Sequence, residues 1–164
     1  MDQHSKLLKD RKILRKIDHN MAQHSRFFMA GNILVFLFVA SIGEYYFRYP
    51  SLTLVWGGLL LTLSAPAFYL SVRFDPTYGA GPARWRNLFV GFQVAIALCM
   101  GFFCALVILL DKLSVNAFLL SLYMVGSSAI SNVEWSPYNQ RNALKLFCNL
   151  VPAIVAYSVL ADIN

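Results

Sequence analysis

Hydrophobic residues gather along the chain in five continuous runs, which polar or basic segments separate. The runs cover roughly residues 27–47, 52–72, 88–110, 115–133 and 143–161. Each is about 20 residues long, which at 1.5 Å per residue matches a hydrocarbon core about 30 Å thick. Because backbone N–H and C=O groups in lipid must be paired within the protein, we expect each run to be a membrane-spanning α-helix.

Composition supports this interpretation. Hydrophobic residues make up 58% of the 164 residues and charged residues only 13%, with a mean hydropathy of +0.55. A soluble domain is typically about a quarter charged. No alternating pattern of about 10 residues, as in a transmembrane β-barrel, replaces the continuous runs. We therefore predict an all-α, polytopic membrane helix bundle with five transmembrane helices, preceded by an amphipathic N-terminal helix.

The segment before the first run is basic and has a helical apolar stripe. Six cations lie between residues 6 and 16. We expect a basic amphipathic cytoplasmic helix over 1–26 that lies on anionic headgroups, followed by a transmembrane bundle over 27–164. A heptad-spaced dimerisation helix is the alternative. The stripe that carries both interpretations consists of Leu7, Leu14, Ile17 and Met21.

The distribution of positive charge predicts the orientation. The chain has 14 Lys and Arg against 8 Asp and Glu, for a net charge of +6 and a pI near 9.4. With the N-terminus in the cytoplasm, twelve of the 14 cations lie inside, and only Arg48 and Lys112 lie outside. This follows the positive-inside rule, so we expect a multi-pass protein of the cell membrane and no nucleic-acid partner. Five crossings place residue 164 outside, and a following cytoplasmic domain would need another crossing.

The residues that could carry catalysis or hold a metal are poorly placed for either role. The cysteines all fall inside apolar runs, where they act as small buried side chains, and the histidines all precede the runs. We therefore expect no metal, no haem and no other cofactor. Glu134 with Arg141 is the nearest approach to a catalytic pair, and both are more simply interfacial, so we expect no enzyme activity. The residues concerned are Cys99, Cys104, Cys148, His4, His19 and His24.

One carboxylate is embedded in an apolar run. Glu44 lies near the outer end of the first run, among aromatic residues. Such a group is either part of an interfacial aromatic belt or the polar anchor of an outward-facing pocket. For the pocket, the candidate ligand-binding residues are Glu44, Tyr45, Tyr49, Trp56, Asn116 and, deeper in the fourth run, Tyr123.

Small residues recur where helices would have to approach closely. Ala97, Gly101 and Ala105 are spaced by four in the third run, and Gly126 begins a stretch of small polar residues in the fourth. Small residues at such spacing let helices pack closely in lipid. We expect all four to be helix-packing residues, with a polar cavity as the alternative for the stretch after Gly126.

From Trp85 onward the order of features resembles a known kind of module. A Trp enters the third run, Met124 to Ala129 form a small-residue stretch, Trp135-Ser136-Pro137-Tyr138 follows, and Pro152 lies in the last run. Over about half of the chain, this resembles the N-terminal multi-pass sensory modules of bacterial histidine kinases and diguanylate cyclases. Such modules commonly have six spans, and often a Trp-Gly pair where this chain has Gly101-Phe102-Phe103.

The resemblance implies a membrane-embedded sensory input module of a bacterial signalling protein, for example in a two-component system. It implies a homodimer in the inner membrane that relays a small-molecule or membrane stimulus by helix repacking. Any catalytic output domain would lie outside this chain. The alternative from the residues alone is a small transporter or channel subunit, complete as given.

Overall fold

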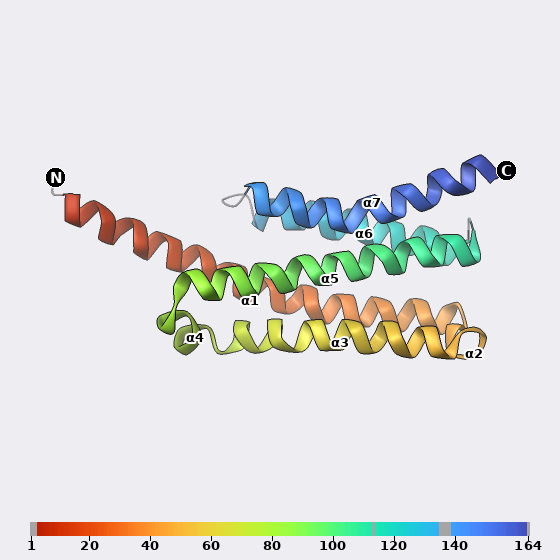
Figure 1. The fold of residues 1–164 in the computed structure, drawn as a ribbon, viewed down its shortest axis with the longest axis horizontal. Coiled ribbons are helices and arrows are strands. Elements are labelled where there is room, and N and C mark those ends of the chain that lie inside the picture. Colours follow the sequence, from red (N-terminus) through yellow and green to blue (C-terminus); the bar gives the residue numbers. More distant parts are fainter. Residues whose placement is uncertain (1–2, 113, 135–138, 164) are drawn as a thin grey trace.

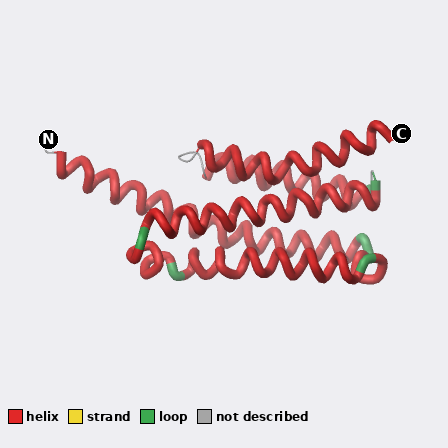
Figure 2. The backbone as a smooth tube through the Cα atoms, viewed as in Figure 1, coloured by secondary structure: helices red, strands yellow, loops and turns green. Residues whose placement is uncertain are grey.

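The computed structural model describes the backbone of residues 3–112, 114–134 and 139–163, and the side chains of 11–112, 114–129 and 143–162. Within these ranges all regular structure is helical (Figure 2). The expected all-helical class is confirmed. The long helices run up and down as a bundle (Figure 1): α1 (Gln3–Ile42), α3 (Pro50–Val72), α5 (Pro82–Asp111), α6 (Val115–Glu134) and α7 (Asn139–Ile163). Two short helices, α2 (Tyr45–Arg48) and α4 (Phe74–Ala80), lie at opposite ends of the bundle.

Several of these helices could cross a membrane. Among the described residues, four segments are long and apolar enough: Arg11–Ile42, Pro50–Val72, Pro82–Asp111 and Ala143–Asp162. The apolar part of α6, Val115–Ala129, is shorter. Large apolar side chains such as Phe27, Leu54 and Phe118 are exposed on the outside of the bundle. An exposed apolar surface of this extent needs a partner other than water, and the apolar helices indicate a membrane protein.

The first helix runs across the boundary predicted at residue 26 between the amphipathic segment and the transmembrane bundle. α1 is continuous over 40 residues and does not break near residue 26. It therefore combines the expected amphipathic helix and the first apolar run in one element about 60 Å long. The physical reason is that neither Gly nor Pro occurs between Gln3 and Ala30. Its N-terminal part extends past the rest of the bundle (Figure 1).

The turns between helices follow from local sequence. α1 ends before Gly43 and Glu44, and Glu44 has a left-handed backbone with φ 54°. α3 and α5 both begin with a proline, Pro50 and Pro82, at their first helical position. Proline is favoured there because the N–H it lacks would be unpaired in any case. These turns reverse the chain direction and align α3 and α5 side by side.

The centre of the bundle is α5, which lies between α3 and α7 (Figure 1) and packs most extensively against α7. Gly101 makes the contact with α7 possible: a Cβ there would lie 2.5 Å from the backbone oxygen of Cys148. Ala97 and Ala105 are buried on the same helix. Gly126 differs, since it is exposed and a Cβ there would meet nothing within 4 Å. A Cβ at Gly126 would therefore be accommodated without any shift of a neighbour.

Candidate functional site

The residues predicted to bind a ligand are divided between two levels of the bundle. Glu44 is exposed, 3.9 Å from Arg48, while Tyr45 is buried and donates its hydroxyl to the carboxylate of Asp111. Burial raises the pKa of Tyr45, and the hydrogen bond to Asp111 raises it further. Tyr49 is exposed, with its ring centre 6.3 Å from that of Tyr45. The α2 end of the bundle is thus held by a tyrosine–carboxylate hydrogen bond.

The remaining candidates take part in contacts between helices. Asn116 of α6 lies next to the Tyr45 side chain. Trp56 lies deeper, where its indole N–H donates to the backbone oxygen of Cys99 at 3.1 Å. Tyr123 donates to the Asn32 side-chain oxygen at 2.7 Å. The structure therefore brings Glu44, Tyr45, Tyr49 and Asn116 to one end and places Trp56 and Tyr123 apart from them.

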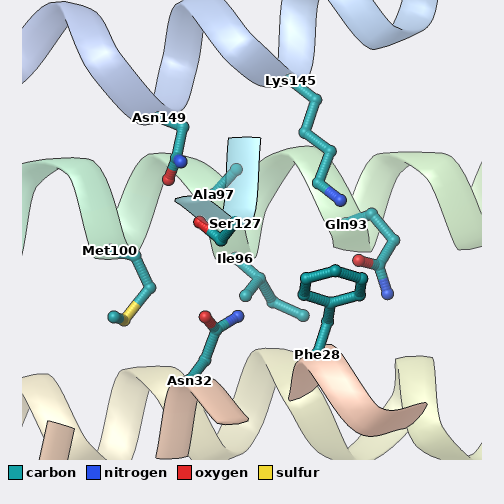
Figure 3. Close-up of a pocket in the computed structure, with 9 residues that line it drawn as sticks. All are labelled: Phe28, Asn32, Gln93, Ile96, Ala97, Met100, Ser127, Lys145 and Asn149. Atoms are coloured by element: carbon teal, nitrogen blue, oxygen red, sulfur yellow. The ribbon is translucent and has the colours of Figure 1, made fainter. Parts of the chain in front are cut away.

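A different set of residues encloses a polar cavity inside the bundle. It has a volume of about 30 Å³ and lies where α1, α5, α6 and α7 meet (Figure 3). A space of this size holds about two water molecules. The cavity is lined by Phe28 and Asn32 of α1, Gln93, Ile96, Ala97 and Met100 of α5, Ser127 of α6, and Lys145 and Asn149 of α7.

The amide of Gln93 is the most constrained group of this cavity. Gln93 is 2% exposed, and its Nε2 has no hydrogen-bond partner within the described part of the chain. A buried donor left unsatisfied costs about 1–3 kcal/mol. Asn149 is also buried, but its Nδ2 donates to Ser128 Oγ at 2.8 Å and approaches the backbone oxygen of Met124 at 3.4 Å. Gln93 is therefore the lining amide that gains most from an incoming acceptor.

The cavity also contains a cation. The Lys145 side chain reaches toward Phe28 and Gln93 (Figure 3), and its ammonium lies 5.7 Å from the centre of the Phe28 ring. None of the nine described residues that line the cavity is acidic. The donors of the lining include the Lys145 ammonium and the Gln93 amide, while the Ser127 hydroxyl donates to the backbone oxygen of Met124 at 3.0 Å. Chemically the lining suits water, a small anion or a ligand with lone pairs, and it has no group that would act as a catalytic carboxylate.

A second polar cluster lies at the α4 end of the bundle. The Asp18 carboxylate of α1 is fully buried and accepts Arg86 Nη2 at 2.6 Å, Arg86 Nε at 3.1 Å and the Tyr78 hydroxyl at 2.8 Å. We call Asp18, Tyr78 and Arg86 the clasp. It joins α1, α4 and α5. Burial raises the pKa of Tyr78, and its hydrogen bond to Asp18 raises it further, so the phenol stays a donor.

Aromatic packing surrounds the clasp. Trp85 is stacked on Phe89 at 4.8 Å between ring centres and meets Phe74 edge-on at 4.9 Å. Its indole N–H donates to the backbone oxygen of Leu70 at 3.1 Å, near the end of α3. All three aromatic residues are buried. The clasp and its aromatic neighbours thus tie α4 to the long helices.

Sequence reasoning missed both clusters. A signal for the cavity was present, because Asn32, Gln93 and Asn149 are each a side-chain amide within an apolar run. For the clasp, Asp18 falls on the same helical stripe as Leu14 and Met21, where an acid needs a buried partner. Neither signal tells which helices meet.

Some earlier expectations lie outside the described residues. The side chains of Glu134 and Arg141 and the segment 135–138 are not described. Among the side chains that are described, no three His, Cys, Asp or Glu residues gather as a metal site would require. No protein-family model matches the chain, and comparisons with curated proteins and with solved structures give no match either.

Proposed function

We propose that this chain is a membrane-embedded sensory input module of a bacterial signalling protein, either a histidine kinase or a diguanylate cyclase. The observation that carries the proposal is that α1 and α5 supply residues to both polar clusters. α1 contributes Asn32 to the cavity and Asp18 to the clasp. α5 contributes Gln93 to the cavity and Arg86 to the clasp.

The spacing along these helices makes a mechanical relay possible. Asn32 and Asp18 are about four helical turns apart on α1, and Gln93 and Arg86 are about two turns apart on α5. A packed helix moves as a rigid element, so a shift of α5 at the cavity also moves Arg86. Asp18 is fully buried, so separating its carboxylate from Arg86 is strongly unfavourable, and the clasp resists small displacements.

The donors of the cavity lining favour a small stimulus with acceptor atoms, such as a hydrated anion. A ligand shifts a conformational equilibrium only by its differential affinity for the two packings. Satisfying Gln93 Nε2 in one packing supplies about 1–3 kcal/mol, which corresponds to about a 5- to 150-fold change in population.

The membrane arrangement that goes with this function has five crossings, with α6 as the fourth. The α4 end then faces the cytoplasm, because the basic residues concentrate there. We place the protein in the inner membrane as a homodimer, as in the signalling proteins that the sequence resembles.

The substitution Gln93→Met tests the relay in the full chain held in lipid nanodiscs. Methionine keeps the length of the side chain and removes the unpaired amide, which stabilises the packing seen in the structure. We expect hydrogen exchange of the α4 amides, at residues 74–80, to slow about fivefold or more. The matched control is Leu98→Met, an exposed site on the same helix.

Two outcomes would contradict the proposal. In the first, Gln93→Met raises the overall thermal stability but leaves hydrogen exchange of the α4 amides unchanged. The cavity and the clasp would then be uncoupled. The other is steady anion flux through proteoliposomes of the purified chain, which would favour the transporter or channel subunit.

A further inference from the structure

A second, larger hollow lies at the α4 end of the bundle, between α1 and the start of α5. Its volume is about 560 Å³, and it is open to the surroundings. It is lined from α1 by Arg11, Leu14 and Arg15, from α4 by Tyr78, and from the first turns of α5 by Pro82, Ala83 and Arg86. A volume of this size falls in the range of small-molecule sites, which is about 300–1,000 Å³. We call this hollow the basic cleft.

The charges of the basic cleft do not cancel. Arg15 bonds Asp75 at 2.8 Å, and Arg86 bonds Asp18 in the clasp, so two of the three guanidinium groups have carboxylate partners. Arg11 is exposed and has no carboxylate partner among the described side chains. A guanidinium presents several N–H donors in a planar fork that matches the oxygens of a phosphate.

The start of α5 adds a second, independent source of positive potential. α5 begins at Pro82 after Gly81, and no side chain caps its N-terminus. The first N–H groups of a helix have no partner within it and carry the positive end of the helix dipole. Since Pro82 and Ala83 line the cleft, this end of a 30-residue helix borders the same space as the arginines. Helix N-termini with these properties are recurrent phosphate sites.

Apart from the arginines and Tyr78, whose hydroxyl bonds Asp18, the cleft wall is apolar. Leu14 is 39% exposed, and Pro82 and Ala83 are exposed next to it. A free phosphate ion would gain nothing from this wall, whereas a phospholipid presents both a phosphate and a hydrocarbon portion. The cleft also lies at the end of the apolar helices, which is the depth at which headgroups meet a membrane protein.

We propose that the basic cleft binds the headgroup of an anionic phospholipid from the leaflet at the α4 end. The phosphate is held by Arg11, Arg15 and the start of α5, and the glycerol and upper acyl chain pack against Leu14 and Pro82. This site rests on the membrane placement of the helices and does not depend on the relay between cavity and clasp.

Retention of lipid by the purified full chain tests the proposal. The chain is taken from vesicles that contain phosphatidylglycerol and phosphatidylcholine, and native mass spectrometry counts the bound lipids. We expect phosphatidylglycerol to be enriched, and Arg11→Gln to lower its retention about tenfold or more, since the variant removes the charge-assisted hydrogen bonds of this guanidinium to the phosphate. The control Lys12→Gln removes the same charge from the neighbouring exposed residue, which does not line the cleft, and leaves retention unchanged.

The proposal is overturned if Arg11→Gln and Lys12→Gln lower retention equally, because the attraction would then be diffuse surface charge. It is also overturned if the chain retains phosphatidylcholine to the same extent as phosphatidylglycerol. The two proposals are tested by different variants. We expect Arg11→Gln to leave the effect of Gln93→Met on α4 hydrogen exchange unchanged, whatever Arg11→Gln does to lipid retention.

Discussion

Asp18 shows how much one residue can constrain the bundle. Its carboxylate is fully buried and, among the described residues, accepts hydrogen bonds from three donor atoms, two of Arg86 and one of Tyr78. Asp75 makes the opposite kind of pair with Arg15, since the two side chains are 71% and 60% exposed. Water and salt screen an exposed pair, whereas a buried charge depends entirely on its partners.

We therefore expect Asp18→Asn to destabilise the protein by about 3 kcal/mol, because it removes the buried carboxylate that accepts two donor atoms of the mostly buried Arg86. Asp75→Asn is the matched control and should cost less than about 1 kcal/mol. Thermal unfolding in detergent, followed by circular dichroism, measures both. Equal destabilisation by the two variants would show that burial does not set the strength of the clasp.

Among the elements, α5 decides the arrangement of the others. It contacts α3, α4, α6 and α7, and its buried share is the largest of the four segments that could span a membrane. Gly101 lets the axis of α5 lie close to α7. A Cβ added at residue 101 would lie 2.5 Å from the backbone oxygen of Cys148 and 2.8 Å from that of Asn149. Because these atoms belong to the backbone, they cannot turn aside as a flexible side chain can.

The substitution Gly101→Val should separate α5 from α7 and destabilise the bundle by about 1–3 kcal/mol. Gly126→Ala should be neutral or stabilise α6 by up to about 1 kcal/mol, since a Cβ there meets open space and alanine favours a helix. Resistance to unfolding in graded detergent mixtures compares the two. A tolerated Gly101→Val would mean that the contact between α5 and α7 is looser than described.

For the molecule as a whole, the number of crossings sets which side each end reaches. The described chain begins and ends at opposite ends of the bundle (Figure 1), as an odd number of passes requires. In lipid, four crossings would instead return both ends to one side. The role of α6, whose apolar part is the shortest, therefore decides the topology.

Cysteine labelling with a membrane-impermeant reagent tests this topology, in a chain whose native cysteines are replaced by alanine. We expect Lys16→Cys to react only from the cytoplasmic side, and Arg48→Cys and Asp162→Cys only from the outside. All three positions are exposed. Reaction of Asp162→Cys from the same side as Lys16→Cys would rule out α6 as a crossing.

The helical class, the apolar segments and the proline-started helices could be predicted from the sequence, because each depends on neighbouring residues. Hydrophobicity adds up along a segment, and Pro50 and Pro82 set their backbone locally. The continuity of α1 was missed, although the absence of Gly and Pro before Ala30 was already visible. The expected pocket around Glu44 stays a prediction, and the polar cavity lies elsewhere.

The sequence by itself determined that apolar helices would dominate this protein, since transfer to lipid is a property of each segment. Only the tertiary structure decided that Gln93, Lys145 and Asn149 line one cavity, and that Asp18 bonds Arg86. These side-chain arrangements depend on how each helix is rotated about its axis and on which helices are neighbours. Both follow from contacts between residues far apart in the chain, such as Gly101 with α7.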